Sequence, residues 1–150
     1  MKVTIELIDD LTTDEVLIRC KKRNYKIDKL VSYIRQLDKI NISFYKDDME
    51  YFIDVNDIFF FETTENSISA HTMNEIYKVK YKLYELEERL PYNFVRISKS
   101  TIVNINYIYA IEKNITSSSL IKFQGTHKQV YVSRLYNKVL KEHMKERKSI

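Results

Sequence analysis

The sequence predicts an α+β protein that is mostly antiparallel β, and three observations carry this prediction. Apolar residues alternate with polar ones over many short runs, which is typical of strands buried on one face. The connections between these runs are short and rich in Asn, Asp and Ser, as in hairpins. Only three stretches show the three- and four-residue apolar spacing of an amphipathic helix.

Residues 1–40 are predicted to form a small ββα unit that serves as a dimerisation or regulatory segment. Alternation predicts strands over residues 3–7 and 15–20, joined by a polar connection. From Tyr25 the spacing becomes helical, so we expect a helix over residues 25–38. The apolar stripe of that helix must be buried against a sheet or a second copy of the chain.

Residues 41–150 are predicted to form the main domain, which consists of strands and two helices. Strands are expected over residues 42–45, 49–53, 58–61, 68–72, 76–79, 94–104, 107–112, 120–124 and 127–132. A helix with Leu83 and Leu86 inward ends at Pro91, because proline cannot continue it. Gly125 is expected at positive φ in a tight turn, and Ser133 can cap a C-terminal helix.

Composition excludes several classes of function. Gly and Pro occur once each, so the chain has no glycine-rich phosphate loop, and the single Cys20 excludes an internal disulfide. Three scattered histidines predict no metal site and no cofactor, and no nucleophile motif or small-molecule substrate site is evident. We therefore expect a non-enzymatic protein. It is expected in the cytoplasm, since no signal pattern or membrane-length apolar run occurs.

Charge is distributed unevenly along the chain. Residues 1–65 carry a net charge of −4, whereas residues 90–150 hold 11 basic and 3 acidic side chains, a net +8. A one-sided basic surplus is expected of a protein that binds a polyanion. The alternative is an ordinary solvated, lysine-rich surface.

Three polar places combine hydrogen-bond donors with expected loop or strand-end positions, roughly 30 residues apart. Their residues are Asn66, Ser67, Arg96, Ser98, Lys99, Ser100, Ser133 and Arg134. Such groups contact phosphates and base edges, and a sheet could bring all three places to one edge. Each alone could equally be a turn with ordinary capping hydrogen bonds.

The runs FFFETTENSISAHT, LYELEERLPYNFVRISKSTIVNINYIYAIE and QVYVSRLYNKVLK resemble the LytTR DNA-binding family of bacterial transcription regulators. The resemblance covers about residues 42–145. It implies a mostly β domain that inserts loops into successive major grooves of double-stranded DNA, binding direct repeats as a homodimer and bending them. The whole chain is similar to stand-alone members without a receiver domain, for which a small membrane-protein regulator is implied.

By motif, the resemblance implies base-facing positions in three loops. The first falls at 65–67, where Asn66 and Ser67 replace the basic or His residue of many relatives. The second is Lys99, with Ser98 and Ser100 as phosphate donors. The third is Ser133-Arg134, followed by Leu135 where some members have a second basic residue.

Some residues of the matched motifs are expected in the core. Phe94, Val103, Ile105 and Ile108 fit the apolar pattern, and Asn104 fits a buried, turn-stabilising amide better than a base contact. Two other functions stay open at this point. One is a protein-interaction module that partners a small membrane protein with little or no DNA readout, and the other is single-stranded RNA binding.

Overall fold

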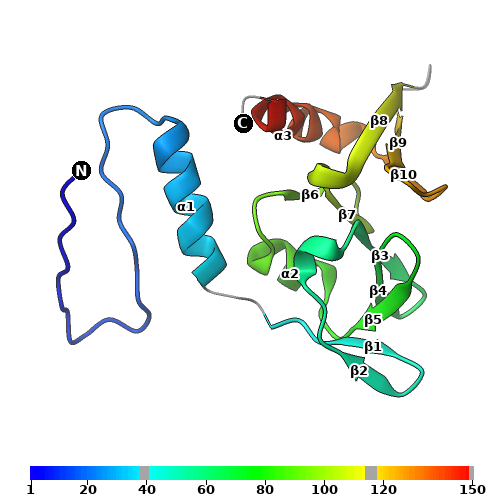
Figure 1. The fold of residues 1–150 in the computed structure, drawn as a ribbon, viewed down its shortest axis with the longest axis horizontal. Coiled ribbons are helices and arrows are strands. Elements are labelled where there is room, and N and C mark those ends of the chain that lie inside the picture. Colours follow the sequence, from blue (N-terminus) through cyan, green and yellow to red (C-terminus); the bar gives the residue numbers. More distant parts are fainter. Residues whose placement is uncertain (38–40, 114–117, 149–150) are drawn as a thin grey trace.

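A computed structural model describes residues 1–37, 41–113 and 118–148. It contains two antiparallel sheets, so the predicted α+β, mostly antiparallel class is confirmed (Figure 1). The seven-stranded sheet has the order β2-β1-β5-β4-β3-β7-β6, and the three-stranded sheet has the order β10-β9-β8. In Figure 1 the second sheet and the C-terminal helix lie above the first sheet, and the N-terminal segment lies to one side.

The first sheet consists of β1 (Phe44–Lys46), β2 (Met49–Tyr51), β3 (Phe60–Thr64), β4 (Ser67–His71), β5 (Ile76–Val79), β6 (Phe94–Arg96) and β7 (Thr101–Asn104). The second consists of β8 (Ile108–Lys113), β9 (Ser119–Phe123) and β10 (Gln129–Val132). The helices are α1 (Tyr25–Leu37), α2 (Leu83–Arg89) and α3 (Asn137–Lys148), with 3-10 turns η1 (Val55–Asp57), η2 (Ile105–Tyr107) and η3 (Arg134–Tyr136).

The centre of the larger sheet is buried on both faces. Successive residues of a strand point to opposite faces, so Phe61 enters one hydrophobic core while Phe60 enters the other. The first core packs under α2, and the second fills the space between the two sheets and α3. This is why the apolar run over 58–61 is continuous, as is typical of a strand covered on both faces.

The short turns follow their sequence signals. The β1–β2 hairpin turns at Asp47 and Asp48, which both have positive φ, of 51° and 63°. Gly125, between β9 and β10, has φ 68°, as expected. The helix that ends before Pro91 is also present as α2.

The stretch over residues 94–104 is a hairpin and not one strand. β6 ends at Arg96 and β7 begins at Thr101, and the two strands pair through Val95 and Val103. Ser98 to Ser100 form the turn. Phe94, Val103, Ile105 and Ile108 are buried, so their predicted core positions are confirmed.

Asn104 is fully buried and joins three segments through its amide. Its Nδ2 donates to the carbonyl of Ile58 at 3.0 Å, and its Oδ1 accepts from Asn93 Nδ2 at 2.9 Å and from the Asn106 backbone N–H at 3.1 Å. A buried amide with these partners is satisfied. Its predicted role as a turn-stabilising side chain is confirmed.

The two predicted N-terminal strands are wrong. Residues 1–24 contain no helix or strand, although α1 forms where the helix is expected. Val3, Ile5 and Leu7 are 82–91% exposed, because no other strand lies beside them to complete a ladder. An isolated pair of short strands without a covering layer is marginal in water. Cys20 is likewise exposed.

The C-terminal helix begins later than predicted. Ser133 precedes η3, makes no capping hydrogen bond through its side chain, and is followed by α3 only at Asn137. Leu140 and Met144 face the second core, whereas Val139 is 42% exposed. The proposed boundary after residue 40 falls at the end of a stretch, 38–40, that lies outside the described residues.

Candidate nucleic-acid interface

The polar loops singled out in the sequence meet at one edge of the molecule. β3 and β7 pair antiparallel, and the Thr63 N–H donates to the carbonyl of Ser100 at 2.9 Å, next to the β3–β4 turn. The Ser133 N–H donates to the carbonyl of Ile97 at 2.8 Å. The turn over 97–100 is therefore the centre, with the β3–β4 turn on one side and the end of β10 on the other.

Arg96 holds the central turn in shape. Its Nε donates to the Ser98 carbonyl at 2.6 Å, and a terminal nitrogen donates to the Lys99 carbonyl at 2.5 Å. The other terminal nitrogen lies 2.8 Å from a carboxylate oxygen of Glu87 on α2. The guanidinium thus points into the protein and fixes the loop, which the sequence pattern does not reveal.

The tip of this turn offers the groups that the sequence predicts. The Ser100 N–H donates to Ser98 Oγ at 3.1 Å, and the two hydroxyl oxygens lie 3.2 Å apart. Lys99 is exposed, and within the described chain its ammonium contacts no protein group. It is a free cation on a constrained loop.

The β3–β4 turn is a weaker candidate. Glu65 has φ 50°, an uncommon conformation for a residue with a side chain, and it puts a carboxylate beside Asn66. Asn66 is exposed, whereas the Ser67 hydroxyl donates to the carbonyl of Thr64 at 3.3 Å. Of the two predicted residues, Asn66 is the one left open to solvent.

The third place follows β10. Arg134 is exposed, and its guanidinium contacts no other group in the described part of the chain. Leu135 next to it is 85% exposed. Ser133 is half-buried because its backbone is bound to the central turn.

A groove of about 430 Å³ runs between the central turn and β10. Its lining includes Ser98, Ser100 and Ser133 together with residues that the sequence pattern does not single out, namely Glu62, Thr101, Ser118, Gln129 and Tyr131. These residues lie mostly on strands, where nothing in the local pattern separates them from ordinary sheet positions. Only the pairing of distant strands brings them to the loops.

Three ionisable side chains, of which Glu62 also lines the groove, join the two sheets. His71 Nε2 lies 2.8 Å from Glu62 Oε1 without hydrogen-bond alignment, and the His71 ring stacks on Phe60 at 4.1 Å. Lys128 Nζ donates to the Thr72 carbonyl at 3.0 Å and lies 3.4 Å from His71 Nδ1. Burial, with Lys128 nearby, lowers the pKa of His71 to about 4, and burial raises the pKa of Glu62.

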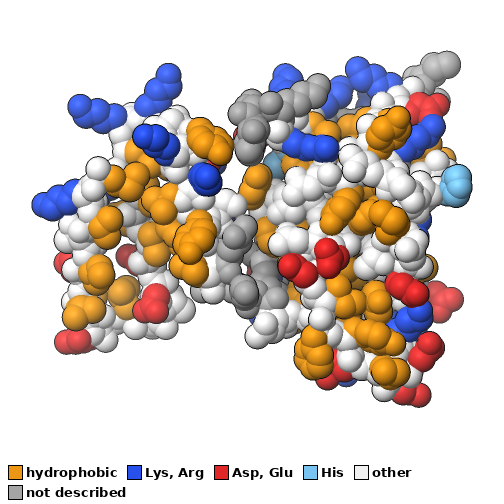
Figure 2. Space-filling model, in the orientation of Figure 1, with side chains coloured by type: hydrophobic (Ala, Val, Ile, Leu, Met, Phe, Trp, Pro, Cys, Tyr) orange, Lys and Arg blue, Asp and Glu red, His pale blue; other side chains and the backbone are white. Residues whose placement is uncertain are grey.

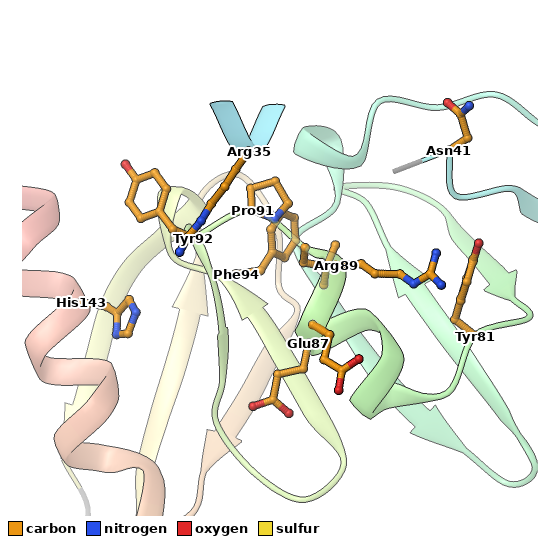
Figure 3. Close-up of a pocket in the computed structure, with 11 residues that line it drawn as sticks. Arg35, Asn41, Tyr81, Glu87, Arg89, Pro91, Tyr92, Phe94 and His143 are labelled. Atoms are coloured by element: carbon orange, nitrogen blue, oxygen red, sulfur yellow. The ribbon is translucent and has the colours of Figure 1, made fainter. Parts of the chain in front are cut away.

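A larger hollow of about 850 Å³ lies between α1, the end of α2 and α3 (Figure 3). Arg35 and Arg89 stand in its wall with Glu87 and Glu88, and His143 lies at its α3 side. Cations and carboxylates both line it, so the hollow favours no single class of ligand. None of the eight predicted contact residues lines it.

Figure 2 shows basic side chains gathered over the upper part of the molecule, where α3 lies, and acidic side chains over the lower strands. Arg147 of α3 is engaged internally, since it donates to the carbonyls of Ile105 and Ile108. Across the described ranges, no three His, Cys, Asp or Glu side chains gather to hold a metal ion. None of the helices in these ranges is long and apolar enough to cross a membrane.

Fold and edge together define a class of protein: a β-rich domain that presents constrained polar turns at one edge. The sequence model of the LytTr DNA-binding domain matches residues 48–145. A LytTr DNA-binding domain from Bacillus cereus has a similar fold, with a TM-score of 0.64 and 24% identity over 69% of this chain and 95% of that one. The chain belongs to the LytTr DNA-binding domain family, as the resemblance predicts.

Full-length relatives are also similar. A protein from Staphylococcus aureus strain NCTC 8325 is 32% identical over 145 residues, covering 96% of this chain and 98% of its own. A second, from the bovine strain RF122, is 33% identical over 148 residues with the same coverage. Both are named HTH-type transcriptional regulators. In the described part of this chain, however, α2 and α3 are separated by strands and do not form a helix-turn-helix.

Proposed function

We propose that this protein is a transcriptional regulator that binds double-stranded DNA sequence-specifically through the turns at this edge, as a homodimer on direct repeats. Membership of a DNA-binding family is the observation that carries the proposal. The names of the S. aureus relatives support the regulatory role. No catalytic step is part of it.

Lys99 and Arg134 are the residues that we expect to read bases. Both cations are exposed and have no protein partner within the described residues, whereas Arg96 is fully engaged. Arg and Lys pair well with guanine in the major groove. Ser98, Ser100 and Ser133 are hydroxyl donors at the same edge and suit the phosphate backbone.

The test is selection of bound duplexes from a random pool. The wild-type chain is expected to select a split direct repeat. Lys99→Ala and Arg134→Ala should each lose about 1–3 kcal/mol of discrimination at one position of the half-site. Lys78→Ala, which removes an exposed lysine from β5, is the control and should keep the full preference.

The outcome that contradicts the assignment is a stable Lys99→Ala or Arg134→Ala protein with an unchanged site preference. If the chain selects no duplex and shows no salt-sensitive binding to DNA, the protein-interaction module is favoured instead. The exposed apolar N-terminal segment is the observation behind that second function. Competition between duplex DNA and single-stranded RNA tests the third function, which is single-stranded RNA binding.

A further inference from the structure

The N-terminal segment exposes apolar side chains that no part of the DNA-binding domain covers. Val3, Ile5 and Leu7 alternate along it and are 82–91% exposed, and Val16 and Leu17 are 65% and 70% exposed. Figure 2 shows hydrophobic side chains gathered over the N-terminal segment and α1. Exposed apolar patches of this kind mark interaction surfaces.

The backbone of this segment is also unpaired. Within described residues 1–23, one backbone hydrogen bond forms, from the Leu11 N–H to the Ile8 carbonyl at 3.4 Å. The alternating segment over 3–7 therefore has the side chains of a half-buried strand and free N–H and carbonyl groups on both edges. Such a segment is a template for pairing with another chain.

Its charges are divided into two opposite blocks. Residues 6–15 hold five carboxylates and no cation, and residues 19–29 hold six cations and one carboxylate. That one carboxylate, Asp28, pairs with Arg23 at 2.5 Å. Among the described residues the remaining five carboxylates and five cations form no ion pair.

We propose that residues 1–34 form a self-complementary interface with a second copy of this chain. The acidic block of one protomer faces the basic block of its partner, and a two-fold axis makes this contact twice. The apolar positions of segment 3–7 and the half-buried stripe of α1, Ile27, Leu30, Val31 and Ile34, are buried between the copies. This inference deepens the proposed function, because it names the surface that makes the homodimer.

Charge complementarity selects the second copy as the occupant. A foreign partner would have to present a basic and an acidic block in matching order, whereas an identical chain does so by symmetry. Pairing inside one chain is the competing arrangement, but the two blocks form no ion pair in the monomer.

Charge reversal tests the interface. One full-length variant carries Lys21→Glu, Lys22→Glu and Lys26→Glu, and the other carries Asp9→Lys, Asp10→Lys and Asp14→Lys. In sedimentation equilibrium the wild type is expected to dimerise at micromolar concentration. Each variant alone should raise the dimer dissociation constant by about tenfold or more, because like charges then face each other. An equimolar mixture should recover a heterodimer with near wild-type affinity.

A matched control changes the same kind of charge elsewhere: Lys138→Glu with Lys141→Glu on α3 should leave dimerisation unchanged. A wild-type chain that stays monomeric at tens of micromolar overturns the inference. So does a mixture that fails to associate, since pairing inside one chain cannot be rescued by mixing.

Binding to a duplex with one half-site separates this inference from the proposed function. Both charge-reversed variants should prefer the same half-site sequence as the wild type, because the blocks lie outside the domain that carries the turns. If the wild type binds no duplex, the proposed function fails and the association data still decide the interface.

Discussion

The Arg96 side chain fixes the shape of the β6–β7 turn. Its guanidinium reaches the carbonyls of Ser98 and Lys99 and the carboxylate of Glu87, so it ties the tip of the β6–β7 turn to α2. A lysine side chain has a single nitrogen, so it cannot donate to these three separate oxygen acceptors as the planar guanidinium does. We therefore infer that Arg96 positions Lys99 and does not itself contact DNA.

Arg96→Lys is expected to weaken binding to the selected duplex by about tenfold while the salt dependence of binding stays the same. Lys99→Ala, in contrast, should also lower the slope of log affinity against log salt if it neutralises a phosphate as well as reading a base. The slopes come from titrations at several salt concentrations. Glu87→Gln, which keeps the hydrogen-bond acceptor, should have a smaller effect than Arg96→Lys.

A drop of about one in the salt slope for Arg96→Gln, which removes the charge that Arg96→Lys keeps, would contradict this role, because it would put the Arg96 guanidinium on a phosphate. Asn104 makes a useful comparison at the same scale. Its structural role follows from the sequence, since it stands between a strand and a turn. The role of Arg96 depends on the path of the loop after it, which the pattern of residues does not fix.

At the scale of elements, the contact between β4, β3 and the segment before β10 is built from ionisable groups. His71 is 7% exposed, stacks on Phe60, and faces Glu62 on one side and Lys128 on the other. Its pKa in the folded state is about 4, below the ordinary 6.5, mainly because burial disfavours the charged ring. The unfolded chain therefore binds the proton more tightly than the folded chain does.

Stability is expected to fall as the pH is lowered from 6.5 to 4. Above pH 6.5 the His71 ring is neutral in both the folded and the unfolded chain, so it does not lower the free energy of unfolding. Below pH 6.5 the ring is protonated in the unfolded chain first, and this lowers the free energy of unfolding by up to about 2–3 kcal/mol by pH 4. Burial raises the pKa of Glu62, so this group has the opposite effect: it lowers the free energy of unfolding as the pH rises above the ordinary pKa of a glutamate. Urea unfolding at several pH values measures the free energy of unfolding.

His71→Gln is the comparison, since it removes the titrating ring and keeps a polar side chain. The variant should lose less stability than the wild type between pH 6.5 and 4. Equal losses in the two proteins would mean that other groups cause the acid sensitivity.

The same elements show which parts of the fold can be predicted from sequence. Strands whose partners are close in sequence, such as β1–β2 and β4–β5, follow from alternation and turn residues. The segment over 3–7 alternates equally well and forms no strand. Alternation shows that one face of a segment is apolar, but it does not show that a neighbouring strand is present to pair with it. Glu62, His71 and Lys128 could not be grouped in advance, since their contact depends on how two sheets pack.

At the scale of the whole molecule, the two proposed surfaces lie on separate parts of the chain. Both hydrophobic cores consist of residues between Ile42 and Met144, and none of their members comes from the first 37 residues. The N-terminal segment therefore adds little to the stability of the domain that carries the polar turns. Association of two chains and contact with one half-site should be independent events.

Trypsin can test this independence. Arg19, Lys21, Lys22 and Arg23 are exposed on a backbone without helix or strand, so cleavage should begin there and leave a fragment that still binds one half-site. Raising the protein concentration should slow this cleavage, because dimerisation covers the segment, whereas a half-site duplex added to dilute protein should not. Mass spectrometry of the fragments reports the cleaved bonds. Protection of the 19–23 bonds by a single half-site in dilute protein would show that the two surfaces are coupled, and the separation argued from the cores would then be wrong.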